Sequence, residues 1–284
     1  MMNFWIRISD IDRRWIYLLM AIAIILPFFV NITIPIRISP PTQDLYTYID
    51  TLSPDSGPIL ISFDYDPSTQ GELTPMAIAL LRHAFSKNLH VITMSLYPTG
   101  IGIAENITSD IAKEYNKIEG RDYVVMPYAP GYSAVILSIG EDIKNTFATD
   151  YYGNRTDTLS CLRGVKNFEQ IPISISISGS STPYAWITYG YTKYGEKIGV
   201  GTTAVSATSY YPYLRTKQVA GMLGGLKGAA EYETLIRKFY HTKGRSMATI
   251  GMNSQSMAHI IMIILIILGN ISYFAIRKQN KRSA

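Results

Sequence analysis

The sequence of 284 residues contains one cysteine, Cys161, and four histidines. A single cysteine can form no disulfide within the chain, so it does not indicate which side of a membrane the protein occupies. His83, His90, His241 and His259 stand apart from one another. Because transition-metal sites in proteins are built from clustered His and Cys ligands, we expect no metal site, and we expect no cofactor.

Several motifs of known chemistry are also missing. The chain has no Gly-x-Ser-x-Gly elbow and no Walker-type loop. Gly199-Val-Gly201 lies inside an expected strand, whereas a dinucleotide site needs its glycines at the start of the following helix. No basic stripe with interleaved aromatic residues occurs in the middle of the chain, which argues against a nucleic-acid partner.

Charge is scarce as well, because charged residues make up 17% of the chain and hydrophobic residues 47%. Residues 15–34 and 257–276 carry no charge, and each run is long enough to cross a hydrocarbon core of ~30 Å. The alternative for the first run is a signal peptide. No small-x-small cleavage site follows it, which favours a retained anchor.

Basic residues gather outside these two runs. Those on the outer flanks are Arg7, Arg13, Arg14, Arg277, Lys278, Lys281 and Arg282. The inner flank of the first run holds only Arg37. The basic residues before the second run lie near the largest distance at which such charges influence membrane orientation. Positive flanks favour the cytoplasm, so we expect an integral membrane protein with both termini cytoplasmic and residues 38–255 outside.

The resulting domain organisation has seven segments. These are a cytoplasmic N-terminal segment (1–14), a first transmembrane helix (15–34), a linker with a short helix (35–57), an extracytoplasmic α/β domain (58–250), a second linker (251–256), a second transmembrane helix (257–276) and a cytoplasmic basic tail (277–284).

Within the central segment, short apolar runs alternate with helical patterns. Expected strands are residues 59–63, 89–96, 122–127, 171–178 and 197–205. This alternation predicts an α/β fold with a five-stranded, mainly parallel sheet and helices on both faces. At the level of topology it resembles flavodoxin-like, Rossmann-like and periplasmic-binding-protein domains. The strict Ile-Ser alternation of residues 171–178 indicates a strand with one polar face, and we interpret it as a sheet edge. The alternative is a strand whose serines face something polar.

The turn after the first strand contains two acids, Asp64 and Asp66. Asp64-Tyr-Asp66 resembles the signature of haloacid-dehalogenase-type phosphotransferases, which implies a nucleophile and an acid–base group at one strand end. The sequence departs from that signature at Pro67-Ser-Thr, and residues 140–142 are only a loose candidate for its magnesium site. The alternative is that both carboxylates cap the turn and the helix start.

Residues 214–240 predict one long helix with two glycine stripes. Gly221 and Gly225 are four residues apart, as are Gly224 and Gly228. Glycine costs about 1 kcal/mol in a helix interior, so we expect a close approach here, either to the domain's own sheet or to another protein. In the second transmembrane run, Gly269 and Asn270 are expected membrane contacts that would favour a protein partner over lipid. The alternative for Asn270 is a position near the membrane interface.

Hydroxyl-bearing residues recur in the loops that follow the expected strands. The candidates for ligand binding are Ser68, Thr69, Thr99, Tyr132, Ser180, Ser181 and Ser209. Such loops meet at one rim of a parallel sheet, where ligands commonly bind. Loops are also rich in these residues without any ligand.

The sequence therefore predicts a non-enzymatic two-span membrane protein whose α/β domain is an assembly or interaction subunit. Its expected partners are the lipid bilayer and either a second copy or another membrane protein. One alternative is a membrane-anchored phosphohydrolase or phosphotransferase that uses Asp64 and Asp66. Another is a module that binds a small ligand at the strand-end loops.

Overall fold

A computed structural model describes residues 12–30, 35–241 and 246–283. The chain divides into two compact units, and the larger, Ile36–Thr249, contains every strand of the described residues. The other unit consists of the two terminal segments, Met1–Pro35 and Ile250–Ala284.

The larger unit is built on a parallel sheet. Its strands are β1 (Ile59–Asp64), β2 (Val91–Met94), β3 (Tyr123–Val125), β4 (Ser174–Ser178), β5 (Ile198–Thr202) and β6 (Val219–Gly224). Their order is β3-β2-β1-β4-β5-β6, and every neighbouring pair is parallel. The parallel α/β prediction is confirmed, with six strands in place of the expected five.

This strand order is that of the doubly wound Rossmann fold, in which the direction of winding reverses between β1 and β4. Ligands of such folds usually bind outside the carboxyl ends of the two strands at the reversal. The end of β1 is Asp64, and its register partner on β4 is Ser178. This crevice is therefore the first place to search for a site.

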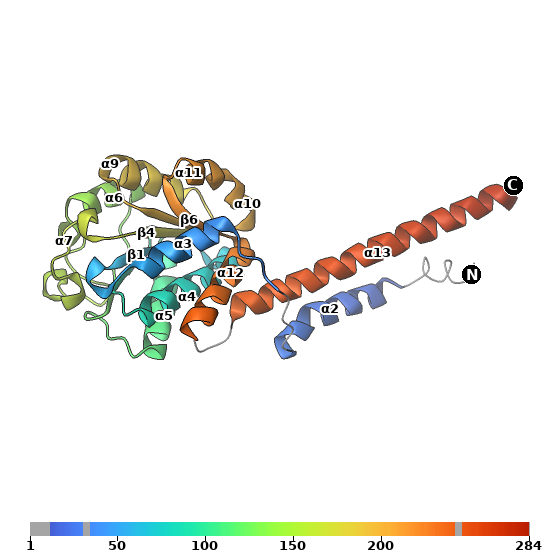
Figure 1. Ribbon diagram of the computed structural model, residues 1–284, viewed down its shortest axis with the longest axis horizontal. Coiled ribbons are helices and arrows are strands. Elements are labelled where there is room, and N and C mark those ends of the chain that lie inside the picture. The colour runs from blue at the N-terminus through green and yellow to red at the C-terminus, as the bar shows by residue number, and fades with distance from the viewer. Residues whose placement is uncertain (1–11, 31–34, 242–245, 284) are drawn as a thin grey trace. The chain divides into compact units, whose positions relative to one another are not determined.

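Helices cover both faces of the sheet (Figure 1). One face carries α3 (Pro40–Thr51), α4 (Gln70–Ser86), α5 (Gly100–Glu114) and α12 (Gly225–Tyr240). The other carries α6 (Tyr132–Glu141), α7 (Ile143–Thr146), α8 (Thr182–Ala185), the π-helix Trp186–Tyr191, α9 (Thr192–Tyr194), α10 (Ala204–Ala207) and α11 (Tyr211–Arg215). Helices on both faces are confirmed.

The predicted long helix over residues 214–240 is wrong. Residues 219–224 form strand β6, and α12 begins only at Gly225. The physical reason is visible at Gly221, where a Cβ atom would lie 2.4 Å from the backbone nitrogen of Leu45. The glycine lets the backbone of α3 lie directly on the edge strand, and this packing outweighs the helical spacing of the apolar residues.

The other three glycines of the predicted interaction helix lie against this chain's own residues. A Cβ on Gly224 would lie 3.1 Å from Ala207, and one on Gly228 would lie 2.9 Å from the backbone of Leu223. Gly225 has a φ of +61° and starts α12 beside Ala204. A further contact of these glycines with another protein stays a prediction.

Strand β4 is not the sheet edge that its Ile-Ser alternation predicted. It lies between β1 and β5, and all five of its residues are buried. The serines face two buried carboxylates, because Ser174 donates a hydrogen bond to Glu196 at 2.8 Å and Ser176 donates one to Asp64 at 2.9 Å. The polar face therefore has buried polar partners, and solvent is not needed to explain it.

Two expected linkers are also different in the structure. Helix α3, expected inside a linker, is packed on β6 and belongs to the domain. Its N-terminus is held by Glu231 of α12, whose Oε2 accepts hydrogen bonds from the amide and hydroxyl of Ser39 at 3.1 and 2.5 Å. Residues 251–256 are helical and form part of α13 (Met247–Ser283).

One helix in the described residues, Met247–Arg277, is long and apolar enough to cross a membrane. The expected N-terminal span over residues 15–34 is not found. Helix α2 (Arg13–Phe29) has 17 residues and contains Pro27, and residues 31–34 lie outside the described part of the chain. Many apolar side chains of α2 are exposed, including Trp15, Ile22 and Phe29.

Candidate functional site

Asp64, at the end of β1, has a fully buried side chain. Its Oδ1 accepts hydrogen bonds from the Ser62 hydroxyl at 2.6 Å and from the Leu96 amide at 2.9 Å. Its Oδ2 accepts from the Ser176 hydroxyl at 2.9 Å and from the Trp186 indole at 3.3 Å. Four donors surround the carboxylate, so it connects β1 to β4, to the loop after β2 and to the π-helix.

Asp66, two residues further on, has a different environment. Its Oδ1 accepts hydrogen bonds from the Ser68 amide at 2.8 Å and the Ser68 hydroxyl at 2.5 Å, and these bonds lower the pKa of Asp66. Burial raises the pKa of Asp64, although its four donors oppose that shift. Asp64 is thus fully buried and Asp66 half-buried. Phosphoryl transfer requires a nucleophile that the substrate can reach, and the buried Asp64 does not meet that requirement.

Hydroxyl groups join the loops around the crevice to one another. Ser178 donates to the carbonyl of Asp64 at 2.9 Å, and its oxygen lies 3.0 Å from the hydroxyl of Ser180. Tyr97, after β2, donates to Ser180 at 2.9 Å, and Tyr210, after β5, donates to the Ser180 carbonyl at 3.3 Å. The loops after β2, β4 and β5 thus converge on Ser180, whose polar groups are already bonded within the chain, and Ser178 connects them to the end of β1.

The other predicted ligand-binding residues lie outside these bonds. Ser68 bonds Asp66, Thr69 contacts Gly179, Thr99 and Ser181 precede α5 and α8, Tyr132 begins α6, and Ser209 lies in the short helix Thr208–Tyr210. Of the predicted ligand-binding residues, Ser180 lies in the crevice, and Thr69 lies against Gly179, the residue before Ser180. Ligand binding by these residues stays a prediction.

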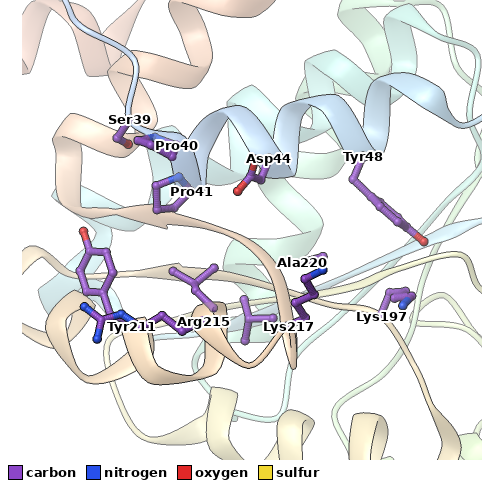
Figure 2. A pocket seen from close by; sticks show the side chains of 12 residues that line it. Ser39, Pro40, Pro41, Asp44, Tyr48, Lys197, Tyr211, Arg215, Lys217 and Ala220 are labelled. Atoms are coloured by element: carbon purple, nitrogen blue, oxygen red, sulfur yellow. The ribbon is translucent and has the colours of Figure 1, made fainter.

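A groove lies at the β6 edge of the sheet, between α3, α11 and strand β6. It has a volume of about 670 Å³, which is within the range of ligand-binding cavities. Figure 2 shows α3 on one side of it, with Pro41 and Asp44, and α11 on the other, with Tyr211 and Arg215. Val219 and Ala220 of β6 also line it.

The groove is rich in positive charge. Lys197, Arg215 and Lys217 line it, and none of them forms an ion pair within the described residues. Asp44 is the only acidic residue among its lining residues. Pro40, Pro41, Leu214 and Val219 supply apolar surface between these charges. The groove therefore combines an apolar lining with three available cations, which suits a ligand that is both extended and anionic.

A buried acid lies beside the groove. Glu196 is 4% exposed and accepts the hydrogen bond from Ser174. Burial raises the pKa of Glu196 to about 8. Tyr48, which lines the groove, donates to the Pro172 carbonyl at 2.8 Å, and its own pKa is raised by burial and by Glu196. The charge of Glu196, beside Tyr48 and Lys197 of the groove, thus changes at mildly alkaline pH.

The groove residues were not singled out by the sequence, because they come from three distant segments and carry ordinary surface charges. Only the glycines near residue 221 gave a signal, which was interpreted as part of a helix. In the membrane helix, Gly269 has open space around it, and Asn270 donates to the Ile266 carbonyl of its own helix at 2.9 Å. A protein partner for these two residues stays a prediction.

Metal ligands do not gather in the part of the chain that the structure describes, where no three His, Cys, Asp or Glu side chains are close enough to hold an ion. Cys161 is buried, and burial raises the pKa of its thiol to about 12. Comparisons of this chain with protein-family models, with curated proteins and with solved structures find no match.

Proposed function

We propose that this chain is a membrane-anchored, non-enzymatic interaction subunit that binds a partner protein in the groove between α3, α11 and β6. In this proposal α13 anchors the chain in the bilayer, and the apolar helix α2 enters the same bilayer. Both termini lie in the cytoplasm and the domain lies outside it, because the basic residues flank the apolar segments on their outer sides.

One contrast carries the proposal. An enzyme of this fold would bind its substrate in the strand-end crevice. There Ser178 is bonded to the Asp64 carbonyl and to Ser180, and Tyr97 is bonded to Ser180. The groove at the sheet edge has a volume of about 670 Å³, apolar walls and unpaired cations. A binding surface is therefore supported at the edge strand, and the buried Asp64 speaks against the phosphohydrolase alternative.

Chemical labelling of introduced cysteines tests this function. The native Cys161 is buried with a raised thiol pKa, so it reacts slowly and need not be removed. Lys217→Cys places a thiol in the groove, and Lys166→Cys places one on an exposed surface loop between β3 and β4 as a matched control. Each variant is labelled with a maleimide in opened membranes of its own cells and after purification in detergent.

If a partner occupies the groove, Lys217→Cys reacts several-fold more slowly in the native membranes than after purification. Lys166→Cys reacts at the same rate in both. Equal rates for Lys217→Cys in the two preparations would contradict the proposed function, provided that the control variant shows equal access of the reagent.

A further inference from the structure

The groove borders the start of strand β6, and a smaller hollow borders the end of that strand. β6 is the last strand in the sheet order, so one of its edges has no strand beside it. The groove of about 670 Å³ includes Val219 and Ala220. A smaller hollow of about 200 Å³ includes Met222 and Gly224, and the two share Ser39, Pro41 and Tyr211 as lining residues.

The backbone of this edge has almost no hydrogen-bond partner outside the sheet among the described residues. The exception is the Thr42 hydroxyl, which lies 3.5 Å from the carbonyl oxygen of Met222. An edge strand with unpaired backbone groups is a template for another extended segment, and the small side chains at Ala220 and Gly224 allow such a segment to approach closely.

The charges along the edge indicate what that segment carries. The larger hollow holds Lys197, Arg215 and Lys217 against the single acid Asp44. In the smaller hollow, Lys227 and Glu231 form an ion pair at 2.9 Å and so contribute little net charge. The surplus is positive and lies at the end where β6 begins.

We propose that a partner protein adds an extended acidic segment to β6 as a further strand, with its carboxylates beside Arg215, Lys217 and Lys197. The proposal rests on the proposed function and names the chemistry of the partner. A segment that matches the six residues of β6 is about 20 Å long. Backbone hydrogen bonds supply affinity in this mode of recognition, and side-chain contacts supply specificity.

Two other occupants fit these observations less well. A small polyanion would use the cations but not the strand edge or the apolar residues Pro41 and Leu214. A second copy of this chain, paired edge to edge, would bring a second set of the same three cations to this edge. An acidic peptide satisfies the charges, the apolar walls and the open backbone together.

Fluorescence anisotropy with the full chain in detergent tests the charge requirement. The probe is a labelled peptide of about nine residues in which Glu alternates with Val and Thr, and the comparison peptide has Lys in place of Glu. We expect the acidic peptide to bind and the basic one not to bind. Arg215→Glu combined with Lys217→Glu should weaken binding by about tenfold or more, since like charges then meet.

The matched control is Arg163→Glu combined with Lys166→Glu, which makes the same change in net charge on an exposed segment close to β3. Binding by this control should stay within about twofold of the wild type. Equal weakening by both double variants would show a nonspecific charge effect and would overturn the proposal.

Peptide backbone chemistry tests the strand addition. Methylation of every peptide nitrogen removes the donors on both edges of the strand, so binding should be lost. Hydrogen exchange at residues 219–224 should slow when the unmodified peptide is bound. The proposal is overturned if the methylated peptide binds as tightly as the unmodified one. It is also overturned if inorganic tripolyphosphate displaces the acidic peptide and itself slows hydrogen exchange at β6.

The failure of this inference is distinguishable from failure of the proposed function. Slow labelling of Lys217→Cys in native membranes, together with no binding of the acidic peptide, would refute the acidic strand and leave a partner in the groove. Equal labelling in both preparations would refute the proposed function itself.

Discussion

The hydroxyl of Ser176 on β4 donates a 2.9 Å hydrogen bond to Oδ2 of Asp64 on the neighbouring strand β1. The same oxygen accepts from the indole of Trp186 at 3.3 Å, and Oδ1 accepts from Ser62 and from the amide of Leu96. Asp64 is thus a buried connection across the reversal point of the sheet. Its position at a strand end resembles that of a catalytic acid, but its bonds are those of a structural one.

We therefore expect Asp64→Asn to destabilise the domain by about 2–4 kcal/mol. The asparagine side chain has one acceptor oxygen and one NH₂ group, so two of the four donors lose their acceptor. Urea denaturation measures the loss. Asp66→Asn is the control and should have a much smaller effect, because Asp66 is only half-buried and an asparagine oxygen can accept the same hydrogen bonds from Ser68. An Asp64→Asn variant as stable as the wild type that loses phosphoesterase turnover would restore the catalytic alternative.

The pKa of Glu196 predicts how stability depends on pH. The folded-state pKa of Glu196 is about 8, above its ordinary value of 4.5. Between pH 4.5 and pH 8 the folded protein therefore holds a proton that the unfolded chain has released. The stability that Glu196 contributes is complete below pH 4.5 and is lost as the pH rises toward 8 and beyond.

The corresponding experiment compares melting temperatures at pH 5 and pH 8 in the wild type and in Glu196→Gln. The variant should lose part of the pH dependence, and at pH 8 it should melt at a higher temperature relative to wild type than at pH 5. Glu169→Gln, at an exposed position, should melt like the wild type at both values. Identical pH dependence in wild type and Glu196→Gln would show that Glu196 is ionised in the folded protein.

Gly221 predicts a second loss of stability. Gly221→Val should force α3 away from β6, because a Cβ there would lie 2.4 Å from the Leu45 nitrogen. We expect a loss of about 3 kcal/mol or more, as overpacked sites show. Gly71→Ala is the control, because nothing lies within 4 Å of its Cβ position in α4. That variant should match the wild type or gain up to about 1 kcal/mol. A stable Gly221→Val would mean that α3 is free to move on β6.

The membrane segments predict how the chain behaves on alkaline extraction. The full chain should stay in the membrane pellet. A chain that ends at residue 256 keeps the contacts of Glu233 with Ala248 and Thr249 and loses most of α13. It should still pellet if α2 enters the bilayer as proposed, and it should become soluble when residues 1–34 are removed as well. Release of the chain that ends at residue 256 would show that α2 is not an anchor.

Local patterns in the sequence were sufficient for much of the fold. The run at residues 59–63 is short, apolar and β-branched, and it forms the core of β1 as expected. Strand β6 was missed because its glycines and its position before α12 mimic a small-residue helix, and only contact with Leu45 decides the matter. The central position of β4 was missed for a similar reason, since the partners of its serines, Asp64 and Glu196, lie elsewhere in the chain.

The candidate groove could not be predicted in the same way. Asp44, Lys197 and Arg215 belong to three segments that are far apart in the sequence, and each one alone is an ordinary surface charge. Their chemistry arises only when α3 folds back onto the edge of the sheet. The strand-end hydroxyls were conspicuous in the sequence, yet at Ser180 they bond to one another.

In the proposed function, the edge groove binds the partner and the strand-end crevice, whose hydroxyls are bonded within the chain, binds nothing. Hydrogen exchange measured on the chain in polymer-bounded discs cut from its native membrane, and again after transfer to detergent, compares the two regions directly. The account predicts faster exchange at residues 211–224 after transfer, with residues 176–186 unchanged. Faster exchange at residues 176–186 with residues 211–224 unchanged would contradict it and would place the partner or ligand in the crevice.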